Sequence, residues 1–146
     1  MIRVSVVASG DIPRILEIDN EAISPSWSIE ALRSEVHRDD SIFLVAVDGA
    51  FVVGFCILRC MADEGELLRI AVDKTCRRCG TASILLKAAL GCAVESSLKT
   101  VFLEVREGNE AAIALYIKHG FKKIGQRKDY YSSPVEDAIL MSWSCE

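Results

Sequence analysis

The chain is poor in proline, in histidine and in long uncharged runs. It has 3 Pro and 2 His in 146 residues, and its longest run without a charge, Gly49 to Leu58, is about half of the ~20 residues that a membrane-spanning helix needs. Its first seven residues lack the apolar stretch and small-residue cleavage site of a secretory signal. With 51% hydrophobic and 26% charged residues, the composition is globular rather than disordered. We therefore expect one domain over residues 1–146, no membrane segment and a cytoplasmic location.

The chain also lacks the excess of basic residues that is typical of nucleic-acid-binding domains. Its net charge is −4 and its pI is about 5.3, so we expect no direct contact with nucleic acid. Basic residues still gather at two places, which are Arg77-Arg78 and a later group of Lys118, Lys122, Lys123, Arg127 and Lys128. Such groups either bind a small polyanionic ligand or form solvated surface, and the sequence leaves both interpretations open.

Six cysteines raise the question of a metal site. The spacings Cys56-x3-Cys60 and Cys76-x2-Cys79 approximate the paired thiolates of a zinc ribbon. Cys56, however, lies inside an apolar run that is typical of a buried strand, where a free thiol behaves as a small hydrophobic residue. We therefore predict no metal site and no structural disulfide.

The first half of the chain predicts helices at one end and an antiparallel meander at the other. Asp11 and Ser28 are suited to cap helices, and Pro13 fits the first turn after Asp11. Asp48-Gly49 is a hairpin turn signal. The predicted elements are a strand over 2–7, helices over 12–20 and 29–36, and strands over 42–47, 51–61 and 66–72.

The second half alternates between strand and helix. Helices are predicted over 80–96 and 110–119 and strands over 100–105, 122–127 and 136–143, with Tyr130 and Tyr131 in the loop between the last two strands. The succession of strand, helix and strand over 66–105 requires a crossover and parallel pairing, so the sheet is predicted to be mixed.

A candidate anion site lies where the strand ending at Val72 leads into the long helix. The pattern Arg77-x-x-Gly80-x-Ala82 opens that helix, whose first amides and dipole favour an anion. Gly80 lets a phosphate approach the backbone without a Cβ in the way. A helix-capping glycine with no ligand is the alternative, and this pattern alone does not separate the two.

Three later residues carry candidate chemistry. Glu104 interrupts an apolar strand that we expect to be central, and a buried, unpaired carboxylate has a raised pKa that suits a general base. The alternative for Glu104 is an ion pair with Arg106 or another basic residue. Asn109 can cap the next helix. Tyr116 carries a phenol that can protonate a leaving thiolate, although a helical tyrosine is often only packed.

Taken together, these segments resemble the GNAT superfamily of N-acetyltransferases. The resemblance is carried, in chain order, by Arg77-x-x-Gly80-x-Ala82, Leu103-Glu104-Val105-Arg106, Asn109, Leu115-Tyr116 and Gly120-Phe121. More narrowly the chain resembles the RimI-type ribosomal-protein alanine N-acetyltransferases in Trp27-Ser28, Ile70-Ala71-Val72-Asp73, Tyr130-Tyr131 and Glu136-Asp137-Ala138-Ile139-Leu140-Met141. It departs from them at Arg77, where Gln is common, and in a short segment between Tyr131 and Glu136.

The resemblance implies an α/β fold of the GNAT type. This is a mixed, mostly antiparallel sheet of six to seven strands, splayed between the fourth and fifth and flanked by about four helices. Acetyl-CoA is the implied co-substrate and lies in the opening, with no metal. The residues implied to bind it are Ile70, Ala71, Val72, Arg78, Cys79, Gly80, Thr81, Ala82, Ser83 and Asn109.

The resemblance also implies the catalytic roles. Glu104 is expected to take a proton from the acceptor amine, directly or through a water, and Tyr116 to protonate the departing thiolate. The amide of Val72 or a neighbour is expected to bind the oxyanion. Transfer is expected to be direct, in a ternary complex, with no cysteine nucleophile.

The implied acceptor is the N-terminal peptide of a small-subunit ribosomal protein, ending in alanine. Trp27, Tyr130 and Tyr131 are expected to wall its binding slot. Acetylation of another protein terminus, a lysine or a small-molecule amine stays open, as does a non-catalytic CoA-binding module.

Overall fold

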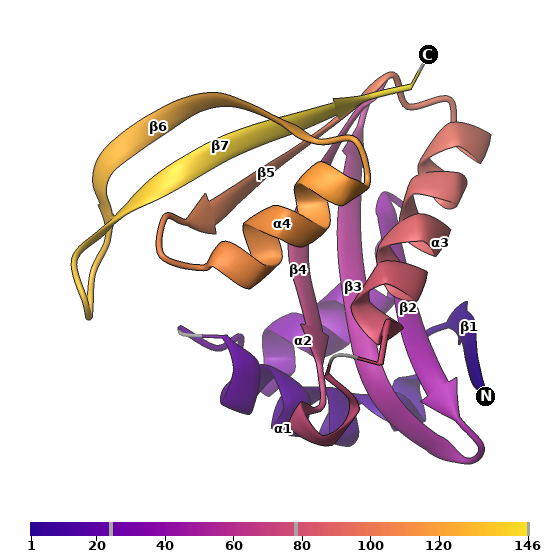
Figure 1. Cartoon of the computed structure of the whole chain (residues 1–146). Helices are drawn as coiled ribbons and strands as arrows, with labels where there is room; N and C mark the ends of the chain where they lie inside the picture. The colour runs from indigo at the N-terminus through magenta and orange to yellow at the C-terminus, as the bar shows by residue number, and fades with distance from the viewer. Residues whose placement is uncertain (24, 78, 146) are drawn as a thin grey trace.

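Figure 1 shows the computed structural model of the chain, which describes residues 1–23, 25–77 and 79–145. Seven strands and four α-helices follow one another along these residues, with two short 3-10 turns at Ser9–Asp11 and Lys74–Cys76. They are β1 (Ile2–Val6), α1 (Ile12–Ala22), α2 (Ile29–Val36), β2 (Ser41–Asp48), β3 (Phe51–Met61), β4 (Glu64–Val72), α3 (Thr81–Glu95), β5 (Thr100–Arg106), α4 (Glu110–Lys118), β6 (Lys122–Tyr131) and β7 (Glu136–Ser144).

The strands form one sheet in the order β1-β2-β3-β4-β5-β7-β6. The β4–β5 pair is parallel, whereas the other pairs among the described residues are antiparallel. The chain reaches β5 from β4 through α3, which is the crossover that a parallel pair requires. The predicted mixed, mostly antiparallel sheet with four flanking helices is confirmed.

The seam between β4 and β5 is closed at one end only. Pairing is confined to Glu64–Thr100, Gly65–Val101 and Glu66–Phe102. Beyond these residues the two strands diverge, as Figure 1 shows, so the rest of β4 is paired with β3 alone. A bulge in β4 at Leu68, opposite the step from Ile57 to Leu58 in β3, lies where the divergence begins.

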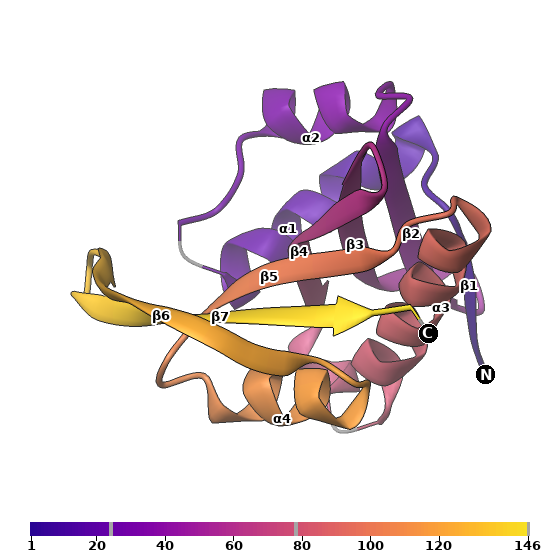
Figure 2. The ribbon, with the colours of Figure 1, turned by 90° about the horizontal axis from the view of Figure 1, so that it is seen from above.

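Helices cover both faces of the sheet. Figure 2 shows α1 and α2 on one face and α3 and α4 on the other. β3 contributes alternate residues to the two cores, because successive side chains of a strand point to opposite faces. Phe55 and Ile57 pack with α1 and α2, and Cys56 and Leu58 pack with α3. Burial on both faces explains why the part of this strand from Val52 to Leu58 is an uninterrupted apolar run.

The helix starts follow the sequence with one exception. Ser28 and Asn109 cap α2 and α4 by accepting hydrogen bonds from the amides of Ala31 and Ala112. The prediction that the Asp11 side chain caps α1 is wrong: its carboxylate instead accepts from the Ala8 amide at 2.8 Å. The reason is local, since a 3-10 turn precedes α1 and gives Asp11 a helical backbone already.

The last hairpin is longer than predicted. β6 extends to Tyr131, so Tyr130 and Tyr131 lie in a strand rather than in a loop. The extension follows an irregularity between Arg127 and Tyr131, where Asp129 has a φ of +52° and its amide donates to the Asp137 carboxylate.

None of the helices formed by the described residues is long and apolar enough to cross a membrane.

Candidate active site

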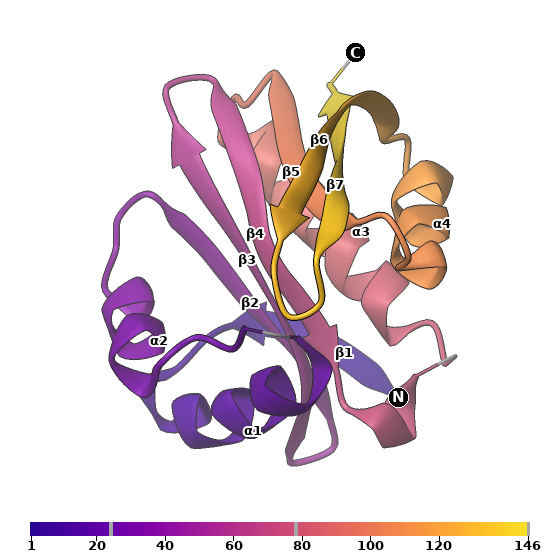
Figure 3. The same ribbon diagram turned by 90° about the vertical axis from the view of Figure 1, so that its left-hand side faces the viewer.

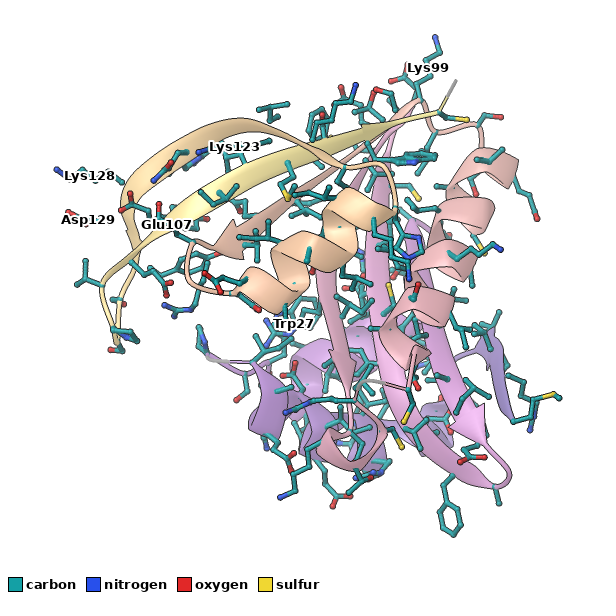
Figure 4. The ribbon with its side chains drawn as sticks, viewed as in Figure 1. Trp27, Lys99, Glu107, Lys123, Lys128 and Asp129 are labelled. Atoms are coloured by element: carbon teal, nitrogen blue, oxygen red, sulfur yellow. The ribbon has the colours of Figure 1, made fainter. Side chains whose placement is uncertain are left out.

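A cleft of about 420 Å³ lies where β4 and β5 diverge. Five segments contribute to its lining: β4, β5, α4, the connection between α1 and α2, and the end of β6. It therefore brings together residues that are far apart in the sequence. In Figure 4 Trp27, which lines the cleft, is seen between α4 and the helices α1 and α2.

Glu104 projects into this cleft from β5. Its neighbours Leu103 and Val105 are buried in the core, and Glu104 lies on the other face of the strand. Its side chain is 27% exposed, so the expectation that Glu104 is well buried is wrong. The divergence of β4 from β5 leaves this side of the strand open, which the apolar pattern around Glu104 does not reveal.

The partners of Glu104 come from β6. The Tyr130 hydroxyl donates a hydrogen bond to Glu104 Oε1 at 3.2 Å, and Arg127 Nε lies 3.8 Å from Oε2. The negative charge of Glu104 is the main reason that the pKa of Tyr130 is raised. The alternative of an ion pair with a basic residue is therefore met by Arg127 and not by Arg106, which pairs with Glu136 at 3.1 Å. Glu104 is thus held by groups at the cleft rather than by its own strand.

Tyr116 lines the same cleft from α4 and is only 7% exposed. Its ring packs against Phe121, with the ring centroids 5.7 Å apart. Burial raises the pKa of its phenol, so the hydroxyl stays protonated at neutral pH. The structure confirms that Tyr116 is packed in the core, and it also places the residue in the lining of the cleft.

The three predicted acceptor-side residues also line the cleft. Trp27 is half-buried, with the Arg69 guanidinium 5.5 Å from its ring centroid. Tyr130 and Tyr131 make an edge-to-face pair at 5.1 Å, and the Arg106 guanidinium lies 4.4 Å from the Tyr131 ring. Burial raises the pKa of Tyr131, with Glu104 as a second cause. Two aromatic walls thus flank the site, one from each half of the chain.

A second cavity, of about 270 Å³, connects the cleft with the start of α3. Both cavities are lined by Ile23, Ile70 and Asn109. The second is also lined by Ala71, Val72, Arg77, Ala82 and Leu115. Its lining joins the end of β4 to the first turn of α3.

The first turn of α3 begins after a left-handed glycine. Gly80 has a φ of +79°, a conformation that favours glycine, and nothing lies within 4 Å of the position a Cβ would take. The Thr81 hydroxyl is buried and has no hydrogen-bond partner among the described residues, and Ser83 Oγ lies 2.6 Å from His119 Nε2. Cys79 is exposed. Arg78, which the sequence also assigns to this site, lies outside the described residues.

Asp73 fixes the turn between β4 and α3. Its carboxylate accepts hydrogen bonds from the amide and the hydroxyl of Thr75, both at 2.8 Å, and pairs with Arg14. These contacts, the Thr75 amide first, lower the pKa of Asp73 to about 2. The loop that leads to Gly80 is therefore anchored at its first residue.

Asn109 caps a helix, as one of its two interpretations from the sequence predicts, and it also lines both cavities. Its Oδ1 accepts a hydrogen bond from the Ala112 amide at 3.2 Å, which caps α4. The same residue lines both cavities.

The described residues contain no group of three or more His, Cys, Asp and Glu side chains arranged to hold a metal ion.

Sequence reasoning missed one buried network beside the cleft. Asp19 is fully buried in α1 and pairs with Arg69 of β4, which lines the cleft. The available signal was an acidic residue directly after the apolar positions Ile15 and Ile18 of the helix. Its partner is 50 residues away and could not be assigned from spacing.

Solved structures share this architecture. The crystal structure of the ribosomal-protein-S18-alanine N-acetyltransferase of Escherichia coli matches with a TM-score of 0.91 and 30% identity, covering 99% of this chain and 94% of that one. The PaiA N-acetyltransferase of Thermoplasma acidophilum, solved in complex with coenzyme A, matches with a TM-score of 0.85 and 21% identity over 99% of each chain. The fold and the match at 30% identity place this chain in the class of acyltransferases.

The sequence gives the family. Residues 12–121 match the model of the acetyltransferase (GNAT) family. The ribosomal protein bS18-alanine N-acetyltransferase of Haemophilus influenzae is 32% identical over 142 residues, which cover 95% of this chain and 96% of the relative. The chain therefore belongs to the GNAT family of N-acetyltransferases, as the resemblance in its motifs implied.

Proposed function

We propose that this chain, acting as one domain over residues 1–146, transfers the acetyl group of acetyl-CoA to the α-amine of a small-subunit ribosomal protein that begins with alanine. The observation that carries the proposal is that Glu104 and Tyr116 line one cleft beside the open part of β4. The activity named for the relatives, which act on bS18 at an alanine, supports this acceptor.

The open part of β4 suits the pantetheine arm of acetyl-CoA. Past Glu66 this strand no longer pairs with β5, so its backbone groups on that side have no strand partner and can meet the amides of the arm. The Val72 carbonyl is the exception, because it accepts a hydrogen bond from Arg77 Nε at 3.2 Å. Ile70, Ala71 and Val72 line the cavities here. We assign the arm to these three residues, with Asn109 beside it.

The start of α3 suits the diphosphate. Its first amides lack partners within the helix and lie at the positive end of the helix dipole, which favours an anion. Gly80 presents no Cβ to block the approach. Within the described residues we assign the diphosphate to the backbone from 79 to 83. Arg77 adds positive charge nearby, although its guanidinium already donates to the Val72 carbonyl at 3.2 Å and lies 3.9 Å from Glu21.

Glu104 is the proposed general base. An amine attacks a thioester only in its neutral form, so a proton must leave it before or during attack. The Glu104 carboxylate accepts that proton directly or through a water. The backbone amide of Val72 or a neighbouring residue stabilises the oxyanion of the tetrahedral intermediate.

Tyr116 is the proposed general acid. When the tetrahedral intermediate collapses, the carbon–sulfur bond breaks and the CoA thiolate takes the phenolic proton. A phenol of ordinary pKa near 10 already carries its proton at neutral pH. Burial raises the pKa of Tyr116 further, which makes it a weaker acid, so the transfer relies on the position of the hydroxyl rather than on its acidity. The acetyl group passes directly from sulfur to nitrogen, and no cysteine of the chain is acylated.

With Glu104 as the single proposed base, an α-amine is an easier acceptor than a lysine side chain. An α-amino group has a pKa near 7.7–8.0 and is tens of per cent neutral near pH 7.5, whereas a lysine near 10.4 is about 0.1% neutral. The α-amine therefore needs less help from Glu104 than a lysine does.

The proposal is tested with three acceptors and acetyl-CoA. One is a peptide with the N-terminal sequence of bS18 from the same organism, beginning with alanine. The second is the same peptide with a blocked terminus and an internal lysine, and the third is a polyamine. Mass spectrometry is expected to find acetylation of the first at the α-amine, with a kcat/KM at least about a hundredfold above the others. A preference for the lysine peptide or the polyamine would replace this acceptor with another amine.

A further inference from the structure

Asp19 is a buried carboxylate that the proposed reaction does not use. It lies on the inner face of α1, where Ile15 and Ile18 pack into the core, and its exposed fraction is 0%. Burying a carboxylate costs free energy unless hydrogen bonds and an opposite charge compensate for it. Its partners therefore indicate what this position does.

Those partners belong to two separate segments. Arg69 Nε donates to Asp19 Oδ1 at 2.6 Å, and the backbone amide of Trp27 donates to Oδ2 at 2.8 Å. Arg69 Nη2 in turn donates to the carbonyl of Pro25 at 2.9 Å, and the guanidinium lies 5.5 Å from the Trp27 ring centroid. One carboxylate and one guanidinium thus tie both Pro25 and Trp27 to β4.

The tied segment forms one wall of the cleft. Pro25, Trp27 and Arg69 line it, whereas Asp19 does not. The opposite wall is formed by Tyr130 and Tyr131 at the end of β6. Figure 3 shows the tip of the β6–β7 hairpin and the connection between α1 and α2 on the same side of the molecule. The gap between these walls is where an acceptor must enter to meet Glu104.

We propose that Asp19 and Arg69 are positioning residues for the acceptor. They hold Pro25 and Trp27 in the conformation that receives the first residues of the acceptor peptide. Because Arg69 belongs to β4, the acceptor wall is fixed to the strand beside which acetyl-CoA is assigned. The inference rests on the proposed function for its kinetic test, although the network itself is measurable without catalysis.

A second buried pair in the same layer provides a matched control. Glu35 of α2 is 2% exposed and pairs with Arg59 of β3. It also anchors an N-terminal helix to the sheet through a carboxylate and an arginine. Neither Glu35 nor Arg59 lines the cleft between β4 and β5. Both residues do line a neighbouring cavity together with Trp27. Replacing Glu35 therefore removes a comparable ion pair near the same tryptophan and leaves the hydrogen bonds of Asp19 to Arg69 and Trp27 in place.

The kinetic test compares Asp19→Asn with Glu35→Gln. We expect Asp19→Asn to raise the KM for the alanine-terminated peptide about tenfold or more, because it weakens hydrogen bonds to a charged group. Its kcat at saturating peptide and its Kd for CoA are expected to stay within about twofold of the wild type. Glu35→Gln is expected to leave all three quantities within the same margin, whatever it does to the Tm.

A spectroscopic test needs no substrate. The chain has two tryptophans, so Trp143→Phe leaves Trp27 as the single reporter. In that background Asp19→Asn is expected to increase acrylamide quenching of Trp27, and Glu35→Gln is expected to leave the quenching unchanged.

Arg69→Lys, which keeps the positive charge facing Asp19, is a milder second variant. Its expected KM and quenching lie between those of the wild type and Asp19→Asn, and it replaces Asp19→Asn if that variant does not fold.

The outcomes separate the two proposals. If the wild type acetylates no alanine-terminated peptide, the proposed function fails, and the quenching data alone decide whether the network holds Trp27. If the wild type acetylates the peptide but a folded Asp19→Asn or Arg69→Lys variant keeps its peptide KM, the positioning role is wrong. An equal rise in KM for Glu35→Gln also overturns it, since general loosening of the layer then explains the effect.

Discussion

The two ends of the seam between β4 and β5 differ in almost every respect. At the closed end, Gly65 is paired with Val101, and a Cβ on Gly65 would lie 2.8 Å from Leu58 Cδ2 and 2.9 Å from Leu98 Cδ1. At the open end the strands part around a cleft of about 420 Å³. The same two strands thus supply tight packing at one end and a site at the other.

The difference shows where polar chemistry is possible in this fold. The closed end is filled by apolar side chains with exposed fractions near zero, such as Leu58, Leu98 and Val101. The open end is a cleft whose lining includes Glu104, Tyr116 and Tyr130. Changes at the open end are therefore expected to alter turnover, and changes at the closed end to alter stability.

The largest expected effect is at the open end. Glu104→Gln is expected to lower kcat/KM about 10³–10⁴-fold, because it removes the general base. The affinity for CoA, measured by calorimetry, and the Tm are expected to stay near the wild-type values. Glu107→Gln, at an exposed acidic residue just after β5, is the control and is expected to change kcat/KM less than twofold. Wild-type turnover by Glu104→Gln would remove Glu104 from the mechanism.

Tyr116→Phe is expected to lower kcat about 10²-fold. The effect is smaller than at Glu104 because a thiol has a pKa near 8.5, so a thiolate leaves with moderate ease even unprotonated. The ring still packs against Phe121, so the variant is expected to fold. Single-turnover measurements of acetyl transfer check this, and an unchanged rate at saturating substrates would assign the proton to another donor.

The closed end gives the opposite result. Leu98→Ala is expected to lower the free energy of unfolding by about 2–5 kcal/mol, since Leu98 is buried and its removal leaves a cavity. The kcat of the folded fraction is expected to stay within about twofold. Urea titration measures the free energy of unfolding, and assays at low temperature measure the kcat. A large fall in kcat with little loss of stability would show that the two ends are not separate.

The smallest expected effect concerns the turn that leads from the seam to α3. The pKa of Asp73 is lowered to about 2 from its ordinary 3.8, so its contribution to stability is present above about pH 4 and is lost as the pH falls through about 2. Asp73→Asn is expected to cost about 1 kcal/mol at pH 6, reduced from the full linkage value by solvent screening. The difference from the wild type should shrink between pH 4 and pH 2 in denaturant titrations. A difference that is constant with pH would mean that the charge of Asp73 does not matter.

Most of the fold could be predicted from the sequence, because the patterns that specify its strands, helices and caps involve residues close together in the chain. The apolar run in β3, the cap at Ser28 and the succession of strand, helix and strand that imposes a parallel pair each lie within a few residues or one crossover. The misassigned Asp11 cap and the shortened β6 arose where a 3-10 turn and an irregular register replaced the simple pattern.

The site could be predicted only in part. The motifs identified Glu104 and Tyr116 as candidates, and the structure brings them to one cleft. The environment of Glu104 could not be predicted, because it depends on where β4 leaves β5 and on Tyr130, which is 26 residues away. The Asp19–Arg69 pair was missed for the same reason. Partners that are distant in sequence are decided by the sheet rather than by the local pattern.

The central claim is that the open end of the β4–β5 seam receives the thioester between Glu104 and Tyr116. A crystal structure of the chain with CoA and an alanine-terminated peptide tests it most directly. The account predicts the pantetheine amides hydrogen-bonded to the backbone at Ile70–Val72, the diphosphate at the first turn of α3, and the CoA sulfur beside the Tyr116 hydroxyl with the peptide amine toward Glu104. CoA bound away from this seam, or a Glu104 carboxylate turned away from the amine, would contradict it.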